Sequence, residues 1–381
     1  MKIKSVHAAP VTDDRVLCGP ETPKAQWHRE LSGRGGVWGA DRVPPWGHVA
    51  CVVTAEDGTW GLGMTSNAGP VASLINDHYA AFLTGQDCMA TEKIWTLMVD
   101  SSVHYSAAGI AGYAISAVDL ALWDLKGKLL GRPVYQLLGG PARDALFCYA
   151  TGFDVEWYKE LGFRAAKLGL PATDIDDPAI IGETEEMIAA ARETLGPDRE
   201  LMLDCYAVRS DQDFVVRLAE RLRPYRLKWV EDYLLPEDLQ GYQSVRRRLP
   251  WQTLASGERW YMLAPFAAAA AMHLVDILQP DIRYVGGMTA SVKICHLAEA
   301  AGIQVMPHLA GGDSYGQHLA YAMPASSWAE FLIITAPGEP MNDGYRTTPG
   351  MTFPKDGLLV PSDAPGFGIE LSMSDIDKAT R

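Results

Sequence analysis

The sequence is poor in cysteine, in positive charge and in long apolar runs. Its six cysteines are scattered without a C-x-x-C pair or tight metal spacing, which argues against a disulfide framework and favours a reducing cytoplasm. Acidic residues outnumber basic ones by 47 to 33, and the resulting net charge of -14 disfavours nucleic acid and anionic membranes as partners. The most apolar stretch, AAPFAAAAAM, is too short to span a bilayer. We therefore expect a cytoplasmic protein that binds neither nucleic acid nor a membrane.

The first third of the chain is predicted to form an α+β unit. The segments KIKSVHAAPV and HVACVVTAEDGTWGLG read as strands, and Asp57-Gly58 in the second is a hairpin signal. Between them, residues 20–47 are rich in Gly, Arg, Trp and Pro, which predicts a long loop of the kind that often forms a lid. From residue 75 to 130, apolar residues recur at helical spacing.

From about Ala145 the pattern changes to short apolar strands that alternate with amphipathic helices, which predicts a parallel sheet. Seven such strands fit a closed (β/α) barrel better than a short doubly wound sheet. The predicted strands are RAAKL, ELMLD, LKWVED, QTLASGE, VDILQPD, IQVMPH and AEFLII. We expect a capping domain with a lid loop over residues 1–130, the barrel over 131–336, and a segment over 337–381 that packs back on the cap.

Ionisable residues lie at or just past the ends of six predicted strands. Because the catalytic residues of such barrels lie at the carboxyl ends of the strands, these side chains should meet at one mouth. Three of them are carboxylates on consecutive strands, and carboxylate oxygens are ligands that Mg²⁺ prefers. The three carboxylates are Asp204, Glu231 and Glu258, and the other three residues are Lys167, Asp281 and His308.

Asp281 and His308 end adjacent strands, so the carboxylate could bond one imidazole nitrogen and make the other a general base. Glu330 lies inside the apolar strand AEFLII, where it could stay protonated and donate a hydrogen bond to a developing oxyanion, or be structural. Removing the proton next to a carboxylate creates an enediolate, which Mg²⁺, Lys167 and Glu330 could stabilise. If a neighbouring hydroxyl then leaves, with His308 as the nearest acid, the product is a 2-keto-3-deoxy acid.

Several longer motifs are shared with a known family. They are AVDLALWDLKGKLLGRPVYQLLGG, GFRAAKLG, LMLDC, KWVED, ASGER, LQPDIRYVGG, MPH and WAEFL. On these motifs, over nearly its whole length, the chain resembles the mandelate racemase group of the enolase superfamily. The resemblance implies an α/β fold, a modified (β/α)7β TIM barrel with an N-terminal α+β capping domain. It also implies Asp204, Glu231 and Glu258 as Mg²⁺ ligands, Asp281 and His308 as the catalytic dyad, and Glu330 as an electrophilic acid.

One departure from the family pattern bears on the reaction. Racemases and lactonising enzymes of this family have a K-x-K motif at the end of the second barrel strand, whereas this chain has Lys167-Leu168-Gly169. Because a racemase needs a base on each face of the α-carbon, the missing second lysine disfavours an epimerase or cycloisomerase. Lys167 could still bind the substrate carboxylate. The alternative from another class is a non-catalytic sugar-acid or metal-binding relative, against which the complete set of strand-end residues argues.

Within that group the chain is most like the L-rhamnonate dehydratases, which also lack the second lysine. The shared pattern includes VYQLLGG, YATG, LMLDC, QPD and PGFGIEL. Arg259 stands where those enzymes typically have histidine, and Asp232 replaces the second glutamate of an E-E pair. We therefore expect a Mg²⁺-dependent hydro-lyase, a homo-oligomer, that acts on L-rhamnonate or a similar aldonate such as L-mannonate or L-lyxonate. The predicted substrate contacts are Lys167, Arg259, His28 and Arg42, with Arg34 as a further candidate.

Overall fold

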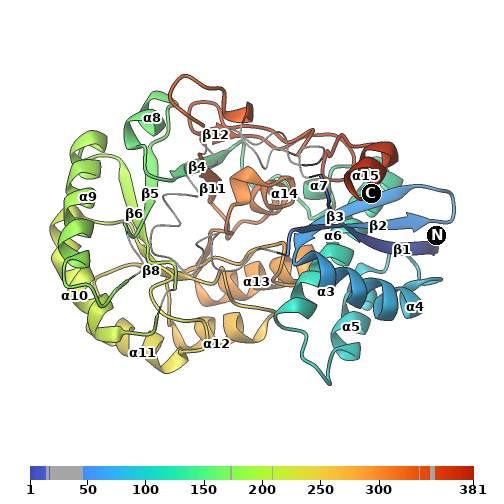
Figure 1. The fold of residues 1–381 in the computed structure, drawn as a ribbon, viewed down its shortest axis with the longest axis horizontal. Coiled ribbons are helices and arrows are strands. Elements are labelled where there is room, and N and C mark those ends of the chain that lie inside the picture. The colour runs from blue at the N-terminus through green and yellow to red at the C-terminus, as the bar shows by residue number, and fades with distance from the viewer. Residues whose placement is uncertain (14–16, 18–45, 172–173, 208, 334, 344–347) are drawn as a thin grey trace.

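The computed structural model combines an N-terminal cap, built on an antiparallel sheet, with a curled parallel sheet ringed by helices (Figure 1). Residues 20–45 of the expected lid loop, with His28, Arg34 and Arg42, lie outside the residues that the structure describes. Within the described ranges, none of the helices has the length and apolarity needed to cross a membrane. The described residues are 1–13, 17, 46–171, 174–207, 209–333, 335–343 and 348–381.

The cap confirms the predicted hairpin, because β2 pairs antiparallel with β3 across the Asp57-Gly58 turn and with β1 on its other edge. Helix α6 packs closely on this sheet because Gly61 and Gly63 lack side chains: a Cβ at either position would collide with the backbone of α6. The cap strands are β1 (Ile3–Pro10), β2 (His48–Ala55) and β3 (Trp60–Ser66). Its helices are α3 (Ala68–Ser73), the π-helix η1 (Leu74–Tyr79), α4 (Ala80–Leu83), α5 (Thr91–Ser101) and α6 (Ile110–Leu130), followed by α7 (Val134–Leu137).

The second sheet holds the strands β4 to β11, paired in parallel in the order β10-β9-β8-β7-β6-β5-β4-β11. Val305 of β10 forms a bridge with Ser326, just before β11, so the two ends of the sheet approach each other as in a barrel. The strands are β4 (Leu146–Thr151), β5 (Ala165–Gly169), β6 (Glu200–Asp204), β7 (Val230–Glu231), β8 (Leu254–Ser256), β9 (Ile277–Leu278), β10 (Gln304–Val305) and β11 (Trp328–Leu332). The helices around it are α8 (Val155–Glu160), α9 (Ile180–Leu195), α10 (Gln212–Leu222), α11 (Leu239–Arg248), α12 (Ala264–Met272), α13 (Gly287–Ala301) and α14 (Ser314–Ala322).

Two strands of this sheet were not predicted. The sequence LFCYAT of β4 is a short apolar run without alternation, which periodicity alone does not distinguish from other buried segments. The short strand β12 (Leu358–Leu359) pairs antiparallel with β4, so the C-terminal segment also contacts the barrel sheet. Its last helix, α15 (Met373–Ala379), lies beside the cap sheet, near both ends of the chain (Figure 1).

Two buried aspartates of α6 join the parts of the fold. Asp124 accepts hydrogen bonds from the backbone N–H of Leu62 in β3, at 2.9 Å, and of Phe367 in the C-terminal segment, at 3.1 Å. Asp119 connects the cap to α13, because its oxygens accept from the N–H and the hydroxyl of Thr289 at 2.8 and 2.6 Å. Both aspartates are therefore structural in this fold.

Burial raises the pKa of Asp119 to about 7, although its bonds to Thr289 act in the opposite direction. The native state therefore binds more protons than the unfolded state between about pH 4 and pH 7, so the free energy of unfolding should fall as pH rises through this interval. Relative to Asp119→Asn, which cannot ionise, we expect the wild type to lose roughly 4 kcal/mol over it. Urea denaturation at several pH values measures this difference. Parallel curves for the two proteins would contradict it.

Candidate active site

The parallel strands bring the predicted ionisable residues together at one end of the barrel. Asp204 and Glu231 are the last residues of β6 and β7 and are partners in register. Glu258, Asp281 and His308 follow just past the ends of β8, β9 and β10. The remaining two lie within strands and are buried, Lys167 in β5 and Glu330 in β11.

The ammonium of Lys167 lies among buried carboxylates. Its Nζ is paired with Glu231 Oε1, lies 2.8 Å from Glu330 Oε1 and is 3.5 Å from Asp204 Oδ2. Desolvation acts to lower the pKa of Lys167, but the charges of Glu231, Glu330 and Asp204 outweigh it and hold the pKa well above its usual value. Lys167 is therefore a permanent cation that links the ends of strands from both sides of β5.

The contacts of Glu330 bear on its two expected roles, a protonated donor or a structural residue. One carboxylate oxygen accepts a hydrogen bond from Thr151 Oγ1 at 2.6 Å, and the other accepts from the backbone N–H of Leu309 at 3.0 Å. Burial acts to raise the pKa of Glu330, but Lys167, then His308 and the Leu309 N–H, lower it to about 2. In this structure Glu330 is an acceptor with Lys167 as the donor beside it, which favours the structural role over that of a neutral donor.

Two residues that the sequence analysis missed hold the carboxylate of Glu231. Trp229 Nε1 and Gln279 Nε2 donate to its Oε2 at 2.8 and 2.7 Å, and both side chains are fully buried inside the barrel. A signal for them is present in the sequence. Alternate residues of a strand point to the same face, and Trp229 and Gln279 each precede a strand-end acid by one such alternation.

His308 and Asp281 form the predicted pair, with His308 Nδ1 2.7 Å from Asp281 Oδ2. The other ring nitrogen, Nε2, faces the site at 3.8 Å from Glu258 Oε1. Desolvation acts to lower the pKa of the imidazole, but the charge of Glu258 and the bond to Asp281 raise it to about 10. His308 in this state keeps its proton, and a cation that offsets the charge of Glu258 lowers the pKa of the imidazole, so that Nε2 loses its proton and can act as a base.

The two departures from the rhamnonate dehydratase pattern, Arg259 and Asp232, form one ion pair. The guanidinium of Arg259 donates to Asp232 Oδ2 at 2.8 Å and lies 3.6 Å from Glu258 Oε1. Ser256 Oγ donates to the other oxygen of Asp232 at 2.7 Å. Arg259 thus lies in the site, as predicted, but part of its guanidinium is used to hold Asp232.

Carboxylates outnumber permanent cations around this mouth, where Lys167 and Arg259 face a larger set of acids. Burial raises the pKa of Asp204 and also that of Glu231, to about 8, because Lys167 offsets only part of the cost. Excess buried negative charge and a set of carboxylate oxygens fit a hard divalent cation. In the described part of the chain, however, no three acidic, histidine or cysteine side chains are gathered closely enough to hold a metal ion together. The acids that surround Lys167 and Arg259 at the mouth are Asp204, Glu231, Asp232, Glu258, Asp281 and Glu330.

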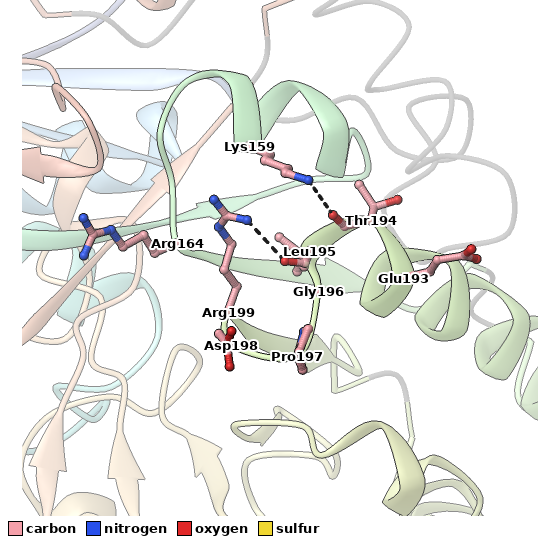
Figure 2. A pocket seen from close by; sticks show the side chains of 9 residues that line it. All are labelled: Lys159, Arg164, Glu193, Thr194, Leu195, Gly196, Pro197, Asp198 and Arg199. Atoms are coloured by element: carbon pink, nitrogen blue, oxygen red, sulfur yellow. Dashed lines mark hydrogen bonds between the residues drawn. The ribbon is translucent and has the colours of Figure 1, made fainter.

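A hollow of about 540 Å³ lies at the opposite ends of β5 and β6, beside the end of α9 (Figure 2). Two of its cations, Lys159 and Arg199, are bonded to that helix. Lys159 Nζ donates to the carbonyl of Thr194 at 3.1 Å, and Arg199 donates to that of Leu195 at 3.3 Å. These bonds satisfy carbonyls that a helix end leaves without partners, so the hollow is explained by helix capping and is separate from the mouth.

The chain matches two family models: "Mandelate racemase / muconate lactonizing enzyme, N-terminal domain" over residues 47–139 and "Enolase C-terminal domain-like" over residues 154–375. It is 36% identical to the L-rhamnonate dehydratase of Saccharopolyspora erythraea, over 98% of this chain and 97% of that one.

Solved structures agree with these matches. Rhamnonate dehydratase from Gibberella zeae, complexed with Mg, superposes with a TM-score of 0.86 at 28% identity, over 99% of this chain and 95% of the other. The 3,6-anhydro-D-galactonate cycloisomerase from Zobellia galactanivorans gives a TM-score of 0.79 at 27% identity, over 100% of both chains. The chain therefore belongs to the enolase superfamily, in the family of mandelate racemase and muconate lactonizing enzyme.

Proposed function

We propose that this protein is a Mg²⁺-dependent hydro-lyase that dehydrates a sugar acid to a 2-keto-3-deoxy acid. The observation that carries the proposal is the His308–Asp281 pair, whose free Nε2 faces the cluster of carboxylates and Lys167 at the barrel mouth. Asp204, Glu231 and Glu258 would hold the ion. Bound Mg²⁺ supplies positive charge that offsets the negative charge of these residues and of the substrate carboxylate.

The first step is removal of the proton on C2 by Nε2 of His308. Asp281 accepts the N–H of Nδ1, which fixes the tautomer so that Nε2 carries the lone pair and stabilises the imidazolium once it forms. The electrons of the C–H bond move onto the substrate carboxylate as an enediolate. Lys167 has three N–H donors, and its two short contacts go to Glu231 and Glu330. Its Nζ lies farther from Asp204 Oδ2, at 3.5 Å, so the third N–H is the one that a substrate oxygen would take.

The second step is loss of the hydroxyl on C3. The enediolate electrons form the C2–C3 double bond as the C3–O bond breaks, and the imidazolium of His308 returns its proton to the leaving hydroxyl, which departs as water. The enol then tautomerises to the 2-keto-3-deoxy acid. His308 serves as both base and acid, because Gly169, in the place of the second lysine, supplies no other group that could accept or donate a proton.

The similarity to rhamnonate dehydratases supports L-rhamnonate, or an aldonate of similar stereochemistry, as the substrate. The second candidate is a cycloisomerase or epimerase of the same superfamily, for which the similarity to the Zobellia enzyme is the specific observation. Both reactions begin with the same proton removal. They differ in what leaves or returns afterwards, so product analysis separates them.

The test is a panel of aldonates, including L-rhamnonate, L-mannonate and L-lyxonate, incubated with the protein and Mg²⁺ in D₂O. We expect a 2-keto-3-deoxy product from at least one of them, detected as its semicarbazone. Dialysis against a chelator should lower the rate at least 100-fold, and added Mg²⁺ should restore it, because several kcal/mol of charge stabilisation are lost with the ion.

Three outcomes would contradict parts of the proposal. Exchange of the C2 proton without keto product would favour an epimerase or cycloisomerase. Full activity after chelation would exclude the metal. No exchange and no product with any aldonate would favour a sugar-acid-binding relative without activity.

A further inference from the structure

The place of the missing second lysine is filled by a tyrosine. Gly169 ends β5 and is the register partner of Asp204, the last residue of β6. A Cβ added to Gly169 would collide with Oη and Cζ of Tyr206. The phenol of Tyr206 therefore lies against the strand end from which a side chain at position 169 would project into the mouth.

The backbone that presents this phenol is strained. Tyr206 and Ala207 both have left-handed conformations, with φ of 59° and 50°, which cost non-glycine residues on the order of 1 to 3 kcal/mol each and cluster at functional sites. Hydrogen bonds hold them there. The N–H of Tyr206 donates to Asp204 Oδ1 at 2.8 Å, and the N–H of Ala207 donates to the carbonyl of Asp232 at 2.6 Å.

Among the described residues, the hydroxyl of Tyr206 has no hydrogen-bond partner, although the side chain is only partly exposed. The charges that act on it are those of the mouth, Asp204, Lys167, Glu231 and Glu258. Tyr158 provides the contrast. It packs on Gly152 in the same way, but it is buried, and its hydroxyl accepts from the N–H of Asp154 at 3.2 Å.

We propose that Tyr206 contacts the substrate and selects its stereochemistry, as a hydrogen-bond donor to a hydroxyl of the sugar acid. Its hydroxyl lies over β5, whereas His308 follows β10, several strands away around the barrel. The position that holds a second base in racemases thus holds a neutral hydroxyl that orients the substrate toward one base. This inference rests on the proposed sugar-acid chemistry, but it concerns binding and needs no turnover.

Calorimetric titration of L-rhamnonate and L-mannonate into the His308→Asn variant with Mg²⁺ tests the contact without catalysis. Adding Tyr206→Phe, which keeps the ring over Gly169, should raise Kd about tenfold for the preferred aldonate and less for the other, as expected for one lost hydrogen bond. Adding Gly169→Ala should displace the phenol and raise Kd by at least the same factor, and the two changes together should not add. Tyr158→Phe is the matched control, with Kd unchanged.

Equal Kd values for the His308→Asn protein with and without Tyr206→Phe would overturn the inference, because a tyrosine that only fills space over Gly169 keeps that role as phenylalanine. If the wild type makes no keto product but Tyr206→Phe weakens aldonate binding, the dehydratase proposal fails and the contact stands. If the wild type forms keto product but Tyr206→Phe leaves Kd unchanged, the dehydratase proposal stands and the Tyr206 contact fails. If neither aldonate binds, the contact is overturned as well.

Discussion

Replacing His308 with asparagine is expected to lower kcat by about 10³- to 10⁴-fold, near the upper end of what general acid–base catalysis contributes, because one residue performs both proton transfers. Asparagine can still donate to Asp281, which accepts from His308 Nδ1 across 2.7 Å in the wild type, so the local structure should survive. The exchange of the C2 proton in D₂O should stop together with product formation.

The control for this variant is His296→Asn, an exposed histidine of α13. It should leave kcat and C2 exchange unchanged. Exchange that persists in His308→Asn while product formation stops would mean that another group removes the C2 proton and that His308 acts only on the leaving hydroxyl. Full activity in His308→Asn would remove His308 from the mechanism altogether.

The pairing of Asp281 with His308 could be predicted from the sequence because it depends only on parallel strands. Residues that follow the ends of parallel strands lie at the same edge of the sheet. In a barrel, strands that are consecutive in the chain are also neighbours in the sheet. The same rule brings Asp204, Glu231 and Glu258 to the same end of the barrel, although no three such side chains of the described residues lie close enough to hold a metal ion together. Predictions of this kind succeed because they require the direction of the strands but no side-chain conformation.

The ionisation of Glu330 could not be predicted in that way. Burial alone favours the neutral acid, and the apolar sequence around Glu330 indicates burial. The opposite result follows from where Lys167 Nζ and the Leu309 N–H lie, at 2.8 and 3.0 Å from its two oxygens. In the sheet order, β4 lies between β5, which carries Lys167, and β11, which carries Glu330. Because β4 was not predicted from the sequence, the closeness of Lys167 and Glu330 could not be predicted either.

Tyr206 was missed for a different reason. The K-x-G pattern shows which side chain is absent, but not what takes its place. The phenol reaches Gly169 only because Tyr206 and Ala207 adopt left-handed backbone conformations, which sequence propensities assign mainly to Gly, Asn and Asp. A residue type that rarely adopts such a conformation gives no local signal, so the tyrosine could be found only in the folded chain.

Lys167→Met is expected to affect both stability and activity. Methionine keeps most of the volume and removes the cation, so Glu231, Glu330 and Asp204 are left as buried acids without their shared partner. Breaking a buried ion pair in this way costs about 3 to 5 kcal/mol. We expect a loss of that size in the free energy of unfolding, measured by urea denaturation in metal-free buffer, and kcat at least 100-fold lower, as when one donor to a developing oxyanion is removed.

Lys159→Met is the matched control, because Lys159 is exposed on α8 and, among the described residues, donates only to the carbonyl of Thr194. It should change stability by less than about 0.5 kcal/mol. The stability of Lys167→Met should also depend on pH in a way that the control does not. Without the lysine, the three acids have higher pKa values in the folded than in the unfolded state, so the variant should be most stable in acid and lose stability as pH rises. A Lys167→Met protein as stable as the wild type at neutral pH would show that these acids do not depend on the lysine charge, and the electrostatic account of the mouth would fail with it.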